Sequence, residues 1–222
     1  MSDEVELRIA WASVAAPTAR SVEVLEDLVG RHRQPHRRYH GLRHVVWVLR
    51  HSRELEGAIA ECQQGVPVYD AASVTAAACF HDAVYDPQAD DNEARSARLA
   101  ESQLASLDWP PARCAFVADL VRATAGHLGD DATGDAAPWE QRVLLDADLA
   151  VLGSEPAGYA AYVNGVRSEY GHLSEAEWAD GRTRVVERLL GRAPLYATSP
   201  ARSWWEDRAR ANLTAELAGL TR

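Results

Sequence analysis

Lysine is missing from the 222-residue chain, so all 23 basic residues are arginines, which we interpret as a compositional bias. No apolar run approaches the roughly 20 residues needed to cross a bilayer. The acidic N-terminal stretch MSDEVELRIAW is unlike a signal peptide. We therefore expect a cytoplasmic protein with no membrane partner.

Cysteine is scarce as well. Cys62, Cys79 and Cys114 are odd in number, widely spaced and form no C-x-x-C pair. This usage argues against a disulfide framework and against a zinc finger, both of which need closely patterned cysteines.

Positive charge is also in short supply, since the net charge is −10. A nucleic-acid polymer is therefore not expected as the main partner, because binding to its phosphates favours a basic surface. One segment departs from this balance: residues 31–44, RHRQPHRRYHGLRH, hold five arginines, four histidines and no acid. It is either a local site for a small anionic ligand or a solvated basic turn.

Helical periodicity runs through nearly all of the chain, interrupted by Gly, Pro and Asp at 63–70 and 128–138. The pattern predicts helices over 3–12, 17–31, from after Pro35 towards Cys62, and over 71–85, 92–107, 110–127, 139–152, 156–171, 174–190 and 200–218. We find no internal repeat, low-complexity linker or composition shift. We therefore predict one all-α domain over residues 1–222, a bundle of about eight to ten helices.

Three sites place polar residues on apolar helical faces. In YHGLRHVVWVL (39–49), His40 and His44 are four residues apart, which on a helix brings both side chains to one side. Trp47 and Val48 follow His44 at +3 and +4 and place it on the buried stripe. His36 and the later His51 extend this face less well, and we interpret them as structural or surface residues.

The second site is His81-Asp82 in AACFHDAVYDP. An isolated carboxylate inside an apolar helix is costly, and a divalent cation that coordinates both groups would remove that cost. The alternative is that Asp82 only hydrogen-bonds the end of a neighbouring helix.

The third site is LLDADLAVLG (144–153), in which Asp148 has apolar residues on its own face. Asp146 points away from it and is expected to form a surface ion pair or to cap a neighbour. His44, His81, Asp82 and Asp148 thus make a set of two imidazoles and two carboxylates. Such a set suits a divalent metal with open positions for water or substrate.

The order His…His-Asp…Asp resembles the HD superfamily of metal-dependent phosphohydrolases, an all-α fold. The wider pattern of YHGLRH, FHDAVYDP, DNEARSA, LDADLAVLG and EYGHL resembles a bacterial branch of predicted phosphohydrolases and covers nearly the whole chain. The HD-x-G-K ending that is frequent in the superfamily is absent. The resemblance implies that His44, His81, Asp82 and Asp148 bind the metal, with Mn, Mg, Co, Ni, Fe and Zn all open. YHxxxH is also similar to cyclic-nucleotide phosphodiesterases, which implies that His40 is the general acid.

Glu93, His127 and Arg43 are further candidates, and the first two each have an alternative. Glu93 could orient the attacking water, or could only be an acid favoured by the helix dipole. His127 could bind phosphate or a second metal, or could simply end a helix. Arg43, like Arg37 and Arg38, could grip phosphate oxygens. We interpret Arg167, Glu169 and Arg182 as a structural salt-bridge set.

The expected activity is hydrolysis of a phosphate ester, with a small nucleotide-like or phosphorylated metabolite as substrate. Asp82 or Asp148 would take up a proton from the attacking water, and His40 would protonate the leaving group. A two-iron HD-type oxygenase needs further histidines between the His-Asp pair and the last Asp, where the chain offers only His127. A helical binding module with a structural metal is a third hypothesis, and a homodimeric assembly stays open.

Overall fold

A computed structural model describes residues 1–62, 69–125 and 137–220, and all regular elements in these ranges are helical. The prediction of an all-α bundle is confirmed. The described residues form ten α-helices and one short 3-10 helix: α1 (Asp3–Ala12), α2 (Ala19–His32), α3 (Leu42–Cys62), α4 (Ala71–Phe80), α5 (Asn92–Ala105), α6 (Pro111–Ala123), α7 (Trp139–Asp148), η2 (Leu149–Gly153), α8 (Pro156–Glu169), α9 (Glu175–Gly191) and α10 (Ser199–Leu220). Most of the two predicted breaks, 63–70 and 128–138, lies outside the described residues.

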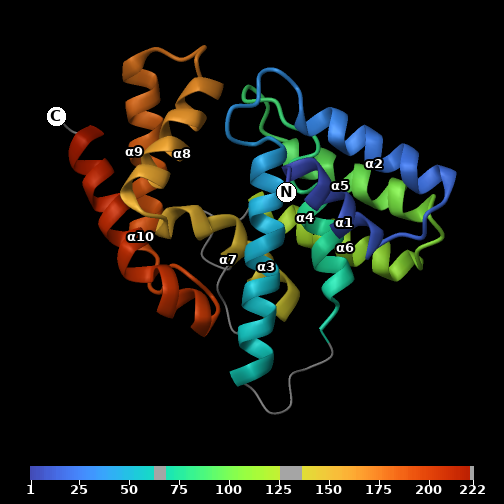
Figure 1. Cartoon of the computed structure of the whole chain (residues 1–222). Coiled ribbons are helices and arrows are strands. Elements are labelled where there is room, and N and C mark those ends of the chain that lie inside the picture. Colours follow the sequence, from blue (N-terminus) through green and yellow to red (C-terminus); the bar gives the residue numbers. More distant parts are fainter. Residues whose placement is uncertain (63–68, 126–136, 221–222) are drawn as a thin grey trace.

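Helix α3 occupies the middle of the bundle and packs against α1, α4, α7 and α10. In Figure 1, α1, α2, α4, α5 and α6 lie on one side of α3, whereas α8, α9 and α10 lie on the other. The buried apolar residues form one cluster that includes Leu55, Leu104, Leu144 and Tyr196. In the described part of the chain, no helix combines the length and the apolarity needed to span a membrane.

Local sequence explains several helix starts. Ser174 and Glu177 form the capping box predicted for α9, in which each side chain meets the other residue's backbone N–H. Thr18 caps α2 in a similar way, because its hydroxyl accepts the N–H of Ser21. Such caps satisfy N–H groups that the first turn of a helix leaves without intrahelical acceptors.

Among the helix ends that differ from the prediction, three carry motif residues. Helix α3 starts at Leu42 rather than just after Pro35, α4 stops at Phe80 rather than near residue 85, and α7 stops at Asp148 before η2. The motif residues therefore lie at helix ends and in turns rather than in the middle of helical faces. Their side chains converge because these ends meet.

Candidate metal centre

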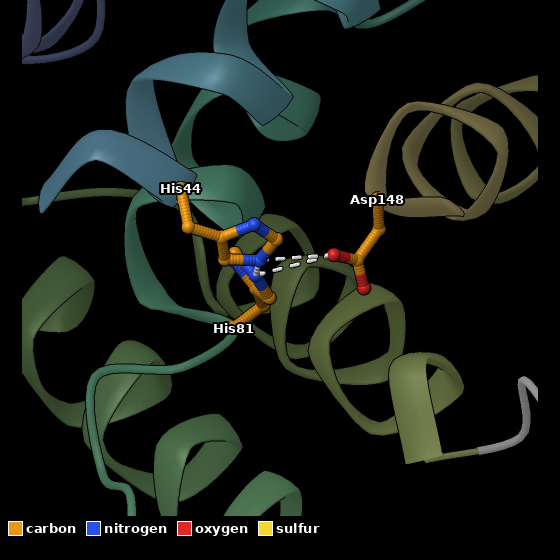
Figure 2. Close-up of side chains that lie close together, drawn as sticks. All are labelled: His44, His81 and Asp148. Carbon is orange, nitrogen blue, oxygen red and sulfur yellow. Dashed lines mark hydrogen bonds and ion pairs between the residues drawn. The ribbon is translucent and has the colours of Figure 1, made fainter. Parts of the chain in front are cut away.

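His44, His81 and Asp148 form a group of side chains that could hold a metal ion. His44 lies in the first turn of α3, His81 directly follows α4, and Asp148 is the last residue of α7. His44 Nε2 lies 3.0 Å from His81 Nε2 and 3.0 Å from Asp148 Oδ1, and His81 Nε2 lies 3.7 Å from the same carboxylate oxygen. Figure 2 shows Asp148 facing the two imidazoles from the opposite side of the site.

Asp82 points at the same two imidazoles. Its Oδ2 lies 3.4 Å from His44 Nε2 and 3.2 Å from His81 Nε2. Neighbouring residues within a helix point about 100° apart. His81 and Asp82 instead stand in the turn that ends α4, where both side chains reach one point. The prediction that they interrupt the middle of a helix is therefore wrong, although the predicted convergence with His44 is observed.

The distances fit a cation held between these atoms. Donor atoms about 2.0–2.2 Å from one ion stand roughly 3 Å from their neighbours. The five distances among His44, His81, Asp82 and Asp148 lie between 3.0 and 3.7 Å. The ends of α4 and α7 that meet here are C-termini, where the helix dipole favours positive charge.

Hydrogen bonding prepares His81 to be a ligand through Nε2. Its Nδ1 lies 2.9 Å from the carbonyl oxygen of Ala78, so Nδ1–H donates there and Nε2 keeps its lone pair for the site. His44 also points Nε2 at the carboxylates, and its buried Nδ1 has no hydrogen-bond partner among the described residues. Both imidazoles thus present the same nitrogen to the centre.

The charges at the centre are strongly coupled. Burial lowers the pKa of His44, but hydrogen bonds to Asp148 and Asp82 outweigh burial and raise that pKa to about 10. Burial likewise lowers the pKa of His81, and the charges of Asp82 and Asp148 reverse the shift, so the net direction is upward. Burial raises the pKa of Asp82, but His81 and His44 hold it well below its usual range. The two carboxylates therefore stabilise positive charge here, whether on the imidazoles or on a bound cation.

His40 is held by Glu169, for which the sequence predicts a structural salt-bridge set with Arg167 and Arg182. Its Nδ1 lies 2.6 Å from Oε2 of Glu169, and Oε1 of Glu169 accepts the backbone N–H of His40. His40 precedes the first residue of α3, so the predicted placement of His40 and His44 one turn apart on one helix is wrong. Their rings are nevertheless close, with centroids 5.6 Å apart. No signal in the sequence linked Glu169 to this histidine.

The three members of that set do not form one network. Arg167 pairs with Glu175, and Arg182 pairs with Glu216. Glu169 instead accepts a hydrogen bond from the hydroxyl of Tyr85 at 2.8 Å, beside its contact with His40. The assignment of Glu169 to a salt bridge with arginine is therefore wrong.

Arg37 is a framework residue rather than a ligand for phosphate. It is 8% exposed, and its guanidinium donates to the backbone carbonyls of His40 and Asp82 at 2.9 and 2.6 Å. A third donation, at 3.2 Å, goes to the carbonyl of Ala83. One buried cation thus ties the His40 turn to the His81-Asp82 turn, and the idea that Arg37 grips phosphate is not supported.

Glu93 reaches the same cavity as Asp148. This cavity of about 260 Å³, here called the Asp148 cavity, is also lined by Tyr39, His40 and Tyr162. Glu93 lies in the first turn of α5, as predicted, and its side chain makes no hydrogen bond or ion pair with another described residue. His127, the candidate for binding phosphate or a second metal, lies outside the described residues.

Arg43 lines a neighbouring cavity of about 170 Å³, here called the Arg43 cavity, together with Arg38, His44 and Trp47. Both arginines are exposed. Two cations at the mouth of a cavity that reaches the metal-ligand candidate His44 are suited to an anionic group. Arg43 and Arg38 therefore stay candidates for substrate binding.

Asp146 is buried rather than at the surface. Its carboxylate accepts the backbone N–H groups of Ala197 and Thr198 at 2.8 and 2.7 Å, just before α10. Burial raises its pKa to about 6, although these hydrogen bonds act in the opposite direction. The alternative of a surface ion pair is therefore wrong, and Asp146 instead binds the backbone of the two residues that precede α10.

Comparisons of the chain with protein-family models, with curated proteins and with solved structures found no match. The chemistry of the site is therefore argued from its own atoms. Two imidazoles, two carboxylates, a His–Glu pair and adjacent cavities are the features that a function has to explain.

Proposed function

We propose that the chain is a metal-dependent phosphohydrolase that cleaves a phosphate ester of a small nucleotide-like or phosphorylated metabolite. The observation that carries this proposal is that the His40–Glu169 pair lies beside the cluster of His44, His81, Asp82 and Asp148. A bound cation and a proton donor side by side are what ester hydrolysis needs. The resemblance of the motifs to the HD superfamily supports the same activity.

The four clustered side chains would hold a divalent cation, with Mn, Mg, Co, Ni, Fe and Zn all compatible with nitrogen and oxygen donors. When bound, such an ion lowers the pKa of a coordinated water and withdraws charge from a phosphoryl oxygen. The chain's own contribution is to keep both imidazole Nε2 atoms directed at the ion and to bring two carboxylates to it.

Proton transfer is assigned to His40 and Asp82, of which His40 lines the Asp148 cavity. Glu169 engages Nδ1 of His40, so Nε2 is the atom of His40 left to protonate the leaving oxygen as the P–O bond breaks. The attacking water loses its proton to the carboxylate of Asp82, and Glu93 orients that water from another part of the cavity wall. Arg43 neutralises charge that develops on the phosphoryl oxygens.

The test combines metal analysis with turnover. We expect purified protein to bind a divalent cation and to hydrolyse at least one member of a panel of phosphomonoesters, cyclic nucleotides and nucleoside triphosphates with Mn²⁺, Mg²⁺, Co²⁺ or Ni²⁺. His81→Ala and Asp82→Ala should abolish both metal binding and activity. His172→Ala is the matched control. His172 is exposed, so this substitution removes a surface imidazole that could bind metal and leaves the centre unchanged.

Three results would each reject the proposal in a different direction. Full metal content and turnover in His81→Ala or Asp82→Ala would show that these residues do not form the metal centre. About two irons per chain in protein purified without added metal would favour oxygen chemistry instead. Metal binding without turnover across the panel would favour a binding module with a structural metal.

A further inference from the structure

A third cavity opens from the position of His40. This cavity of about 330 Å³, here called the Trp178 cavity, shares His40, Tyr162 and Val185 with the Asp148 cavity. Its volume lies within the range of about 300–1,000 Å³ typical of small-molecule sites. Since His40 lines both cavities, a substrate whose phosphate lies beside Asp148 can extend past His40 into the Trp178 cavity.

The walls of the Trp178 cavity are aromatic and aliphatic. Tyr162, Tyr170 and Trp178 contribute rings, and Val166, Leu173 and Val185 contribute aliphatic side chains. The rings of Tyr170 and Trp178 are tilted by 42° with centroids 5.9 Å apart. Flat π surfaces of this kind stack on planar rings with little dependence on the identity of the ring.

No uncompensated charge faces this cavity among its described lining residues. Arg182 is the only arginine in that lining, and its guanidinium binds Glu216 at 2.8 and 3.0 Å and the hydroxyl of Tyr162 at 3.0 Å. Both partners of this ion pair are buried, with side chains 5% and 8% exposed. His40 is likewise paired with Glu169. An ionised group entering here would lose its hydration without gaining a partner, so the walls favour a neutral occupant.

A glycine keeps the cavity open. Gly181 lies inside α9, where glycine is less favourable than alanine because it loses more backbone freedom on folding. A Cβ atom at this position would meet only the tip of the flexible Arg184 side chain, at 3.8 Å. Since Gly181 lines the cavity, the side chain of any larger residue would fill space that is now available to a ligand.

We propose that the Trp178 cavity binds the leaving alcohol of the substrate. This alcohol is uncharged and carries a planar aromatic ring, as a nucleoside does. This inference rests on the proposed function, because it assigns His40 as the proton donor to that alcohol. The phosphoryl group and the alcohol then lie on either side of His40. Water attacks phosphorus, the bond from phosphorus to the alcohol oxygen breaks, and His40 supplies the proton that this oxygen takes up.

The decisive variant is Gly181→Leu, which fills the cavity while leucine improves the helix propensity of α9. The matched control is Gly57→Leu, since Gly57 is an exposed glycine inside α3 and a Cβ added there would have no atom within 4 Å. With adenosine 5′-phosphate we expect Gly181→Leu to lose kcat/KM by about 10-fold or more. Glycerol 1-phosphate, whose alcohol needs no pocket, should be turned over equally by both variants and by the unchanged protein.

A binding measurement separates the cavity from the chemistry. Adenosine, titrated against the intrinsic tryptophan fluorescence, should bind saturably to the unchanged protein and to Gly57→Leu but not to Gly181→Leu. If adenosine bound in this way but no phosphate ester were hydrolysed, the aromatic cavity would be supported as a binding site and the proposed phosphohydrolase activity would be rejected. The cavity assignment would be overturned if neither adenosine nor thymidine bound. It would also be overturned if Gly181→Leu and the unchanged protein had equal kcat/KM with adenosine 5′-phosphate.

Aliphatic occupants are tested with octyl phosphate. A higher kcat/KM for octyl phosphate than for adenosine 5′-phosphate would overturn the preference for an aromatic alcohol. If Gly181→Leu does not fold, as judged by circular dichroism, Trp178→Ala takes its place and should weaken adenosine binding selectively, with Trp204→Ala as its exposed control.

Discussion

Nδ1 of His40 lies 2.6 Å from Oε2 of Glu169, a residue 129 positions further along the chain. Oε1 of the same carboxylate accepts the backbone N–H groups of Arg38, Tyr39 and His40 at 2.7, 2.7 and 2.9 Å. Burial raises the pKa of Glu169, but the hydrogen bond with His40 reverses the shift and the net pKa is about 2. One ionised carboxylate therefore fixes both the backbone that carries His40 and the direction of its ring.

Glu169→Gln should lower kcat by about 10- to 100-fold, a part of the 10²–10⁴-fold that a general acid contributes. The amide still offers an oxygen to the three backbone N–H groups, so the fold should persist. A neutral amide no longer offers Nδ1 of His40 a charged acceptor, so the ring loses the partner that fixes its direction. Steady-state measurement of kcat and KM checks the loss, which should appear in kcat rather than in KM.

Glu175→Gln is the control for that substitution, because Glu175 is an exposed acid of α9 that pairs only with Arg167 among the described residues. Glu169 would be shown to have a purely structural role if Glu169→Gln lowered the melting temperature but left kcat unchanged.

Arg37→Met should weaken metal binding by about 10- to 100-fold, as loss of groups that orient ligands commonly does. The physical reason is that the carbonyls of His40, Asp82 and Ala83 lose their shared buried donor, and the two turns that carry the centre separate. Calorimetric titration with Mn²⁺ measures the affinity. Arg43→Met should raise KM and leave the metal affinity unchanged; an equal loss of metal affinity in both variants would contradict these separate roles.

Gly153→Ala should destabilise the protein by about 1–3 kcal/mol, the usual cost of overpacking. An added Cβ would lie 2.5 Å from Cβ and 3.0 Å from Cα of Trp205 in α10, and the backbone atom cannot move aside cheaply. Urea unfolding followed by circular dichroism gives the free energy of unfolding. Gly30→Ala in α2, where no atom lies within 4 Å of the added Cβ, should be neutral or stabilising by up to about 1 kcal/mol.

His32 should make the folded state sensitive to acid. It is 2% exposed, its Nε2 lies 3.0 Å from the carbonyl oxygen of Cys79, and burial lowers its pKa to about 3. The unfolded chain takes up this proton near pH 6.5 and the folded chain only near pH 3. The stability that neutral His32 contributes is therefore complete above pH 6.5 and is lost as the pH falls towards 3, by about 1.4 kcal/mol per pH unit.

His32→Gln removes this titration and keeps a side chain that can donate to Cys79. The free energy of unfolding of the variant should fall less steeply between pH 6.5 and pH 4 than that of the unchanged protein. Parallel slopes for the two proteins would show that His32 does not titrate on unfolding in this range.

Much of the architecture follows from local sequence. Helical periodicity predicted the helices, and the Ser174–Glu177 capping box marked the start of α9, because both depend on residues within one or two turns of each other. The same local logic found His44, His81 and Asp148, since an ionisable residue among apolar neighbours stands out in any short window. The structure brings these three together, as expected.

Other features depended on contacts that no short window contains. The start of α3 at Leu42 goes with a buried carboxylate, Glu169, that binds the backbone before it from far along the chain. In the sequence, Arg37 looks like one member of an exposed basic segment. In the structure, its guanidinium donates to backbone carbonyls of the turn after α4.

By itself, the sequence determined the all-helical fold and the residue types of the centre, because these follow from periodicity and from the cost of burying charge. Only the tertiary structure decided where the helices end, which carboxylate orients His40 and which cavities open beside it. Those features depend on hydrogen bonds and packing between segments that are distant in the chain, and such partners are chosen when the helices meet.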